Sequence, residues 1–133
     1  MSTPLGKRRN VLIVDDDLIN IFIAGEFLKN HFDVHGVVNG HEALNAVEKA
    51  HYDIILMDIN LGDEKMDGLR TMRMIRNNRK NRNVKIFAVT TYSNSPELYI
   101  KQGFDEFFMK PVSEKLVEQL INIIVVENQK NIR

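Results

Sequence analysis

The chain has 133 residues with an ordinary globular composition, 44% hydrophobic and 27% charged, so we expect one domain with one core rather than a disordered segment. Its 18 basic and 18 acidic residues cancel, and the lack of cysteine excludes disulfides, thiolate catalysis and cysteine-ligated zinc. No apolar stretch approaches the roughly 18 residues that span a bilayer, and no signal peptide is evident, so we expect a cytoplasmic protein without membrane contact.

Apolar runs and amphipathic stretches alternate along the chain. We predict strands at about 10–14, 33–38, 53–57, 85–90 and 106–109. We predict helices at about 18–30, 40–50, from 68 to the Asn-rich stretch 77–83, 95–103 and 113–127. Asn39 and the Ser95-Pro96 pair are suited to begin two of these helices, and Gly103 to end one.

Five successive strand–helix units predict a doubly wound α/β fold. Such a fold has a five-stranded parallel sheet with helices on both faces, because parallel strands need crossover connections. We take the whole chain, 1–133, as a single domain with its core at about 10–127. The polar tails are expected at 1–9 and 129–133.

Four of the predicted strands end in polar residues. The first runs into Asp15 and Asp16, the third into Asp58, the fourth into Thr90, and the fifth into Lys110. Because the carboxyl ends of parallel strands meet at one edge of a sheet, we expect these side chains to converge there. Carboxylates beside a hydroxyl and an ammonium predict a site for a divalent cation and a phosphoryl group.

The charges are unevenly distributed along the chain. Residues 65–85, here called the basic run, carry many lysines and arginines against the single acid Asp67. We interpret the basic run as a solvated helix face and loop, and as a candidate partner surface. Clustered basic residues can bind nucleic acid, but no recognition helix, zinc module or interleaved aromatic residue accompanies them. Nucleic acid is therefore not the expected partner.

Five short motifs occur in a characteristic order. They are VLIVDDD at 11–17, DIILMDIN at 53–60, MDG at 66–68, AVTT at 88–91 and FFMKP at 107–111. In this order and spacing they resemble the receiver domain of two-component response regulators, over nearly the full length of the chain. The resemblance implies a flavodoxin-like (βα)5 fold with strand order 2-1-3-4-5.

The resemblance also implies a role for each residue at the predicted edge. Asp58 would accept a phosphoryl group as an aspartyl phosphate, and Mg²⁺ would neutralise the charge of the two meeting anions. Thr90 and Lys110 would each contact a phosphoryl oxygen, and the Lys110–Pro111 peptide bond would be cis. The implied ligands of Mg²⁺ are Asp16 and Asp58 directly, Asp15 largely through water, and the backbone carbonyl of Asn60.

Phe107 stands at the position of the family's switch aromatic, which moves inward when Thr90 approaches the phosphoryl group. The alternative for Phe107 is simple core filling beside Phe104 and Phe108. The implied donor is a sensor histidine kinase or a histidine phosphotransfer protein, and the implied target is a protein effector. A dimer formed on phosphorylation is a further expectation. No room for an output module remains after residue 127, so we expect a stand-alone receiver.

Two features depart from the usual receiver pattern. Leu61 and Gly62 replace the usual methionine and proline after the phosphoacceptor, and residues 63–65 lengthen the following loop with two acids and a lysine. We expect the longer loop to slow donor access or to change the surroundings of the metal. Thr91 stands where alanine, glycine or serine is commoner, so the entrance to Asp58 is expected to be narrower.

The first helix is more apolar than a half-buried helix needs. Asp17 is expected at its N-terminus, where an acid is favourable. Leu18, Ile19 and Phe22 are then left near the surface, as a candidate docking patch for a helical bundle that carries the donor histidine. The alternative is a wide core face that buries them all. The stripe expected to face the sheet is Asn20, Ala24, Phe27, Leu28 and His31.

Two other functions use related sites. A phosphohydrolase of the haloacid dehalogenase type needs a second aspartate two residues after the nucleophile, where this chain has Asn60. A degenerate receiver that serves only as an interaction scaffold would not need the full set of edge residues. Flavin or dinucleotide binding is not expected, since no glycine-rich loop follows the first strand. We therefore expect a signalling switch that catalyses only its own phosphorylation and dephosphorylation and is not a turnover enzyme.

Overall fold

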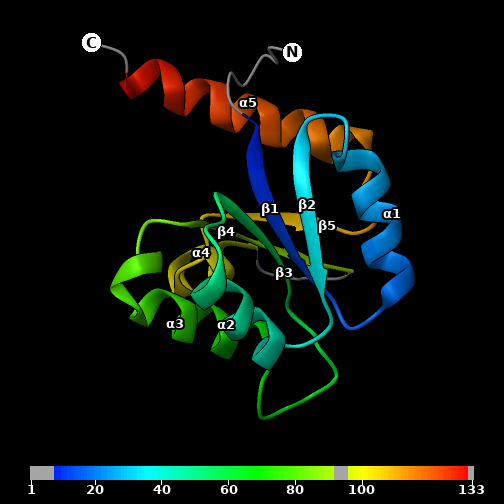
Figure 1. Cartoon of the computed structure of the whole chain (residues 1–133), viewed down its shortest axis with the longest axis vertical. Coiled ribbons are helices and arrows are strands. Elements are labelled where there is room, and N and C mark those ends of the chain that lie inside the picture. Colours follow the sequence, from blue (N-terminus) through cyan, green and yellow to red (C-terminus); the bar gives the residue numbers. More distant parts are fainter. Residues whose placement is uncertain (1–7, 92–95, 132–133) are drawn as a thin grey trace.

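One parallel sheet organises the fold. The computed structural model describes residues 8–91 and 96–131. The strands are β1 (Arg9–Val14), β2 (Phe32–Val37), β3 (Ile54–Asp58), β4 (Lys85–Thr90) and β5 (Glu106–Met109). They lie in the order β2-β1-β3-β4-β5, and every neighbouring pair runs parallel, which confirms the predicted doubly wound topology (Figure 1).

Helices cover both faces of this sheet. They are α1 (Leu18–Leu28), α2 (Gly40–Lys49), α3 (Gly68–Asn77), α4 (Pro96–Gln102) and α5 (Glu114–Asn131), with a short 3-10 helix η1 (Arg79–Asn81) before β4. The helices α1 and α5 pack on one face, and α2, α3 and α4 on the other (Figure 1). None of the described helices is both long and apolar enough to cross a membrane.

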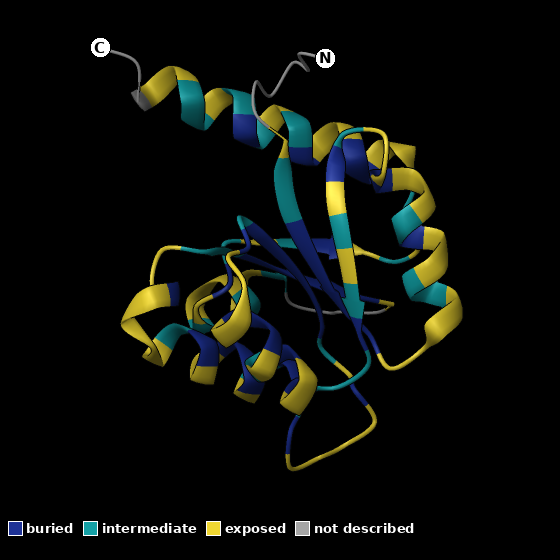
Figure 2. Ribbon diagram, viewed as in Figure 1, coloured by how far each residue is buried: buried dark blue, intermediate teal, exposed yellow. Residues whose placement is uncertain are grey.

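The burial of β1 explains why its sequence is an unbroken apolar run. Val11 and Ile13 face the core under α1 and α5, whereas Leu12 and Val14 face the core under α2 and α3. A central parallel strand is covered on both faces, so it has no solvent-facing position for a polar residue. At the sheet edge β2 alternates instead, and Asp33 on it is exposed (Figure 2).

Most elements differ from the prediction only at their ends. Asn39 caps α2 as expected, since its side chain accepts a hydrogen bond of 2.8 Å from the Glu42 N–H. Strand β1 begins at Arg9, within the predicted tail, and η1 was not predicted. Helix α4 begins at Pro96, and its expected cap Ser95 lies outside the described residues.

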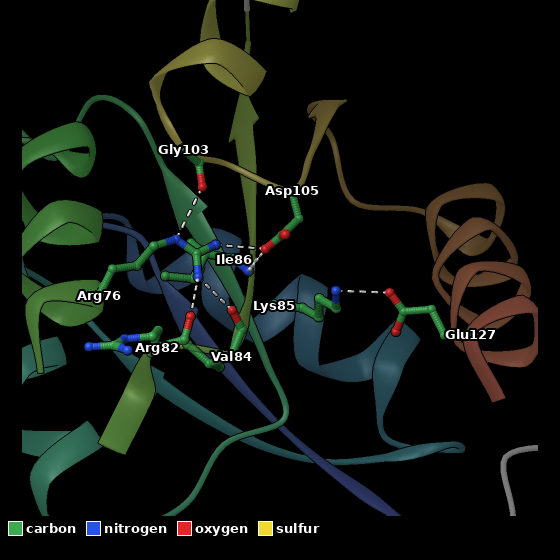
Figure 3. A network of polar contacts seen from close by, with 8 residues as sticks. All are labelled: Arg76, Arg82, Val84, Lys85, Ile86, Gly103, Asp105 and Glu127. Carbon is green, nitrogen blue, oxygen red and sulfur yellow. Dashed lines mark hydrogen bonds and ion pairs between the residues drawn. The ribbon is translucent and has the colours of Figure 1, made fainter. Parts of the chain in front are cut away.

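Helix α5 is longer than predicted. It continues to Asn131, beyond the predicted end at about 127, so residues 129–131 of the expected polar tail are helical. The end of the helix is held on the sheet by an ion pair, in which Lys85 Nζ lies 3.0 Å from Glu127 Oε1 (Figure 3). This pair joins residues far apart in the sequence, and a local pattern of apolar residues does not reveal it.

Arg76, in the middle of the basic run, is a structural residue (Figure 3). Its guanidinium donates hydrogen bonds to the carbonyls of Gly103 at 3.1 Å and Val84 at 2.9 Å. It also lies 2.7 Å from Asp105 Oδ2, which in turn accepts a bond of 2.8 Å from the Ile86 N–H. The interpretation of the basic run as a solvated face is therefore wrong for Arg76, which joins α3 to the segment between α4 and β5 and to the residue before β4.

Candidate functional site

Strand ends bring the predicted polar residues to one edge of the sheet. Asp15 directly follows β1, Asp58 and Thr90 end β3 and β4, and Lys110 directly follows β5. The Asp15 N–H donates to the Val37 carbonyl at 3.1 Å, and the Lys110 N–H donates to the Thr90 carbonyl at 2.7 Å. Both residues therefore continue the ladder of the sheet, and their side chains are held by the backbone rather than by a free loop.

Two buried carboxylates share the ammonium of Lys110. Its Nζ lies 2.7 Å from Asp15 Oδ2 and 2.8 Å from Asp58 Oδ2, and the three side chains are 13%, 6% and 7% exposed. Asp16 is exposed, yet one oxygen from each of Asp15, Asp16 and Asp58 lies within 4.8 Å of the others. Three acids and one ammonium thus form what we call the acidic cluster, in which negative charge is in excess.

Short-range backbone contacts orient these carboxylates. Asp15 Oδ1 accepts a hydrogen bond of 2.9 Å from the Asp17 N–H, and Asp58 Oδ1 accepts one of 3.1 Å from the Asn60 N–H. Asp17 turns away from the cluster and caps α1, because its Oδ1 accepts from the Ile19 N–H at 2.8 Å. Each carboxylate of Asp15 and Asp58 thus has one oxygen on the backbone and the other on Lys110.

Gly68 allows α3 to begin directly against the strand end that carries Asp58. A Cβ atom at Gly68 would overlap the backbone carbonyl oxygen of Asp58 and would lie 2.8 Å from Ile59 Cα. The Gly68 N–H instead donates to the Ile59 carbonyl at 3.0 Å. From the sequence, Gly68 is expected only as part of a motif and near the start of a helix. The close approach of two backbones gives it a physical role that the order of residues alone does not show.

The lengthened loop after Asn60 is anchored at both ends. Leu61 and Met66 are buried, and the Asn60 side chain accepts a hydrogen bond of 3.1 Å from the Gly62 N–H. Gly62 has a φ of 77°, in the left-handed region, and a Cβ there would lie 3.0 Å from Asp16 Oδ2. The loop therefore passes close to the exposed acid of the acidic cluster.

A cavity of about 230 Å³ opens beside the acidic cluster. Its polar wall includes Asp15, Asp58 and Lys110, and its apolar wall includes Ile13 and Val89 from the sheet. Thr91 is exposed and lines the same cavity, whereas Thr90 is buried at the end of β4. A small group can therefore reach Asp58 from the carboxyl edge of the sheet.

Phe107 is half-buried beside α4. Its ring stacks on that of Tyr99, with centroids 5.4 Å apart and planes inclined by 1°. It packs against the core under α2 and α3, so in this conformation it fills space as the core-filling alternative expects. The Lys110–Pro111 peptide bond at the end of the same strand is cis.

Helix α1 leaves apolar side chains in solvent (Figure 2). Leu18 is 70% exposed, and Ile19 and Phe22 are each 67% exposed, so the wide core face that would bury them is excluded. One residue of the predicted sheet-facing stripe was placed wrongly: Phe27 is exposed, and Ile21 packs on the core instead. The three residues Leu18, Ile19 and Phe22 form what we call the α1 patch, next to the edge that carries Asp58.

Burial and the excess of acids shift two pKa values in the acidic cluster. Burial raises the pKa of Asp58, and the nearby charge of Asp15 adds to this, although Lys110 opposes both. Burial by itself would lower the pKa of Lys110, but its hydrogen bonds to Asp15 and Asp58 outweigh this and raise it. The cluster therefore favours protonation at both groups when no metal is bound.

We expect the metal-free domain to lose stability as the pH rises from the ordinary pKa of Asp58 through its raised folded-state pKa. Across this interval the folded state binds more protons than the unfolded state, so the free energy of unfolding falls with rising pH. Asp58→Asn should remove this component and stabilise the domain at neutral pH. Urea unfolding of both proteins in EDTA, across the acid range and at neutral pH, tests this. A variant less stable than the native chain at neutral pH would contradict it.

The donor set of the acidic cluster fits a hard divalent cation. Within the described residues, the group that could hold a metal consists of Asp15, Asp16 and Asp58, and every donor atom is a carboxylate oxygen. Magnesium prefers carboxylate oxygens together with water and substrate oxygens, and the exposed Asp16 leaves room for such ligands. Asn60 lies beside the cluster, with its N–H on Asp58 Oδ1.

Known proteins resemble this chain in both sequence and structure. Sensor protein GacS of Pseudomonas syringae pv. syringae is 31% identical over 125 residues, which cover 89% of this chain and 14% of GacS. The chain thus spans about a seventh of this curated relative. A CheY-like receiver domain from Methylobacillus flagellatus has a TM-score of 0.80 and 26% sequence identity. The match covers 89% of this chain and 99% of the chain in that structure.

A second solved structure is the receiver domain of a sensor histidine kinase from Pseudomonas aeruginosa, which has a magnesium ion coordinated in its active site cleft. Its TM-score is 0.77 at 25% sequence identity, and the match covers 90% of this chain and 99% of the chain in that structure. A family model described as the response regulator receiver domain matches residues 11–122, most of the chain. The chain therefore belongs to the family of response regulator receiver domains.

Proposed function

We propose that this receiver domain is a phosphoacceptor switch that takes a phosphoryl group onto Asp58 from a histidine kinase or a histidine phosphotransfer protein. The observation that carries the proposal is the shared position of Lys110 between Asp15 and Asp58 at the open edge of the sheet. A buried carboxylate beside an ammonium, and beside acids that suit a cation, can act as a nucleophile toward phosphorus.

We assign Mg²⁺ to the acidic cluster as the cofactor. Asp15, Asp16 and Asp58 would hold it, with the backbone carbonyl of Asn60 as a further ligand. When bound, the ion supplies the positive charge that allows an anionic nucleophile to meet an anionic phosphoryl group. The magnesium ion in the cleft of the Pseudomonas aeruginosa receiver supports this assignment.

The residues of the chain then have separable roles. A carboxylate oxygen of Asp58 attacks phosphorus while the P–N bond of the donor phosphohistidine breaks and its electron pair returns to the imidazole. The ammonium of Lys110 moves from the carboxylates to a phosphoryl oxygen. The Thr90 hydroxyl donates a hydrogen bond to another phosphoryl oxygen. The backbone bond of 2.7 Å between Lys110 N and Thr90 O couples the positions of these two residues.

Incubation with acetyl phosphate and Mg²⁺ tests the proposal. Intact-protein mass spectrometry should show a gain of one phosphoryl group, removed by hydroxylamine as expected of an acyl phosphate, and EDTA should prevent it. No gain in a folded domain would support the interaction scaffold instead. Turnover of phosphate monoesters, as opposed to loss of acetyl phosphate through the domain's own dephosphorylation, would support a phosphohydrolase. Beryllofluoride binding that is equally strong with and without Mg²⁺ would overturn the metal assignment.

We further propose that phosphorylation alters the surface formed by α4, β5 and the start of α5. Movement of Thr90 toward the phosphoryl group would free space for Phe107, whose ring now stacks on Tyr99. The driving force is the difference in affinity of the phosphoryl group for the two conformations. With beryllofluoride and Mg²⁺, amide signals of residues 96–112 should shift in NMR spectra, and Asp58→Asn should prevent this. Shifts limited to the acidic cluster would contradict the switch.

The α1 patch is the proposed docking surface for the phosphoryl donor. Exposed apolar side chains beside a reactive edge suit the apolar face of a helical bundle that presents the donor histidine. The double variant Leu18→Gln and Phe22→Gln should reduce transfer from the cognate donor by tenfold or more, because each buried apolar side chain stabilises the complex by about 1.5–3 kcal/mol. Labelling by acetyl phosphate should be unchanged.

A control with the same chemical change lies away from this edge. Met74 on α3 and Val126 near the end of α5 are also exposed apolar residues, and their replacement by Gln should leave both reactions unchanged. Equal losses with both pairs, or loss of acetyl phosphate labelling in the Leu18 and Phe22 variant, would show that the α1 patch is not a specific donor surface.

A further inference from the structure

A second cavity lies at the amino edge of the sheet, opposite the acidic cluster. Its volume is about 260 Å³, large compared with the roughly 30 Å³ that one water molecule occupies in the liquid. Residues at the beginnings of β1 and β4, the segment before β3, η1 and the end of α5 line it. The phosphoacceptor reaction proposed above uses none of these residues.

Two buried hydrogen-bond donors on residues that line this cavity have no acceptor. Asn81 in η1 is only 7% exposed, and its Nδ2 has no hydrogen-bond partner among the described residues. The same holds for Nε of Arg9, which is buried although another nitrogen of its guanidinium donates to Asn128 Oδ1 at 3.1 Å. Buried donors are almost always paired in folded proteins, because leaving them without an acceptor destabilises the fold. Solvent does not reach either nitrogen in this conformation, so a ligand rich in acceptors would satisfy both after the two side chains turn toward the cavity.

Positive charge around the cavity exceeds negative charge. Its basic lining residues are Arg9, Arg79, Lys80 and Lys85, and its acidic ones are Asp53 and Glu127. Both acids are already engaged: Glu127 pairs with Lys85 (Figure 3), and Asp53 accepts from the Asn10 N–H at 2.8 Å. Within the described part of the chain, Arg9, Arg79 and Lys80 have no carboxylate within salt-bridge distance. The cavity is therefore electropositive.

We propose that this cavity binds a small oxyanion of the phosphate class, free or as the phosphate group of a small molecule. A phosphate dianion offers mainly acceptor oxygens, which suits the unpaired donors of Asn81 and Arg9, and its two negative charges suit the surrounding excess of cations. Arg79 is exposed at the rim, where it can close on the ligand. An extended polyanion would contact the rim but would not reach the two buried donors.

The site also explains part of the basic run. Arg76 is used in the structure, as described above, whereas Arg79, Lys80 and Lys85 come together at the cavity only because η1 turns the chain back toward the start of β4. Arg9, from the other end of the sequence, completes the group. A bound anion would link β1, η1 and α5, and it would stabilise the folded domain because the unfolded chain has no such site.

NMR titration of the metal-free native domain with inorganic phosphate tests the proposal. At constant ionic strength, amides of residues 9, 51–53, 79–85 and 127–128 should shift in a saturable way, and chloride should not produce these shifts. Asn81→Asp, which places a carboxylate among the donors, should weaken binding at least tenfold. Arg79→Gln should also weaken binding, and it changes only an exposed side chain, so it reports on binding if Asn81→Asp fails to fold.

The matched control is Arg73→Gln, which removes the same charge from an exposed position of α3 outside the cavity. It should leave phosphate affinity unchanged. Glycerol phosphate as a second probe separates the two sources: tighter binding than inorganic phosphate identifies a phosphate ester, and weaker binding identifies the free ion. Shifts that do not saturate, or an equal loss of affinity in Arg73→Gln and Arg79→Gln, would show diffuse charge screening and overturn the proposal.

Discussion

Asp58→Asn is expected to abolish phosphorylation by acetyl phosphate in the presence of Mg²⁺. The amide keeps the shape of the side chain and can still accept a hydrogen bond from Lys110, but its neutral oxygen is not a nucleophile toward phosphorus. It also removes one of the three carboxylates of the acidic cluster. In mass spectra of the intact protein, the phosphorylated fraction should fall below the detection limit.

The control for this variant is Asp63→Asn, which makes the same change in the exposed loop beside the cluster. Asp63 accepts a hydrogen bond from the Lys65 N–H through a side-chain oxygen that asparagine retains, so the loop should keep its form. This variant should be labelled like the native chain. Labelling that persists in Asp58→Asn would place the phosphoryl group on another carboxylate, with Asp16 the nearest exposed one, and would refute the assignment of Asp58.

The positions of Asp58, Thr90 and Lys110 could be predicted because they depend on local sequence. Each follows an apolar run that is long enough for one buried strand, and parallel strands bring all such ends to the same edge. The contact between Lys110 and Asp15 is different, since it joins β5 to β1 across the sheet. Only the strand order, which the family resemblance supplied, places these two residues on opposite sides of Asp58, with β1 on one side of β3 and β4 and β5 on the other.

In helix α1 the local sequence pattern does not identify which residues face the core. Nearly every residue from Leu18 to Leu28 is apolar, so the periodicity barely distinguishes one face from another. The choice of Ile21 over Phe27 as a core residue depends on a distant position: the Ile21 side chain occupies the space that a Cβ at Gly36 would need. Such steric complementarity between α1 and β2 is a tertiary feature.

The amino-edge cavity was missed for a related reason. Arg9 and Asn81 belong to no motif, and each looks like an ordinary surface residue in its own segment. Their donors become unpaired only after β1, η1 and α5 have packed together and removed them from water. No single stretch of the chain therefore identifies these two donors. The basic run was evident in the sequence, but the sequence did not show that some of its residues line a cavity.

Replacing the single cation of the acidic cluster should have the opposite effect to replacing one of its acids. Lys110→Met keeps most of the unbranched side chain but leaves Asp15 and Asp58 buried without a counter-charge. Removal of one partner from a buried ion pair typically destabilises a protein by about 3–5 kcal/mol. We expect a loss of this order in urea unfolding of the metal-free domain, and lower stability as the pH rises through the further raised pKa of Asp58.

Either of two changes, binding of Mg²⁺ or a second substitution, should restore much of this stability, because each reduces the excess of negative charge in the acidic cluster. Mg²⁺ would return positive charge to the acidic cluster, and Asp15→Asn in the Lys110→Met background would remove a negative one, so the double variant should be more stable than the single variant. Lys115→Met, at an exposed position of α5, is the control and should change the free energy of unfolding little. If Lys110→Met destabilised the domain equally with Mg²⁺, without it and with Asp15→Asn, its effect would lie in packing. The acidic cluster would then not be the electrostatic centre on which phosphorylation of Asp58 depends.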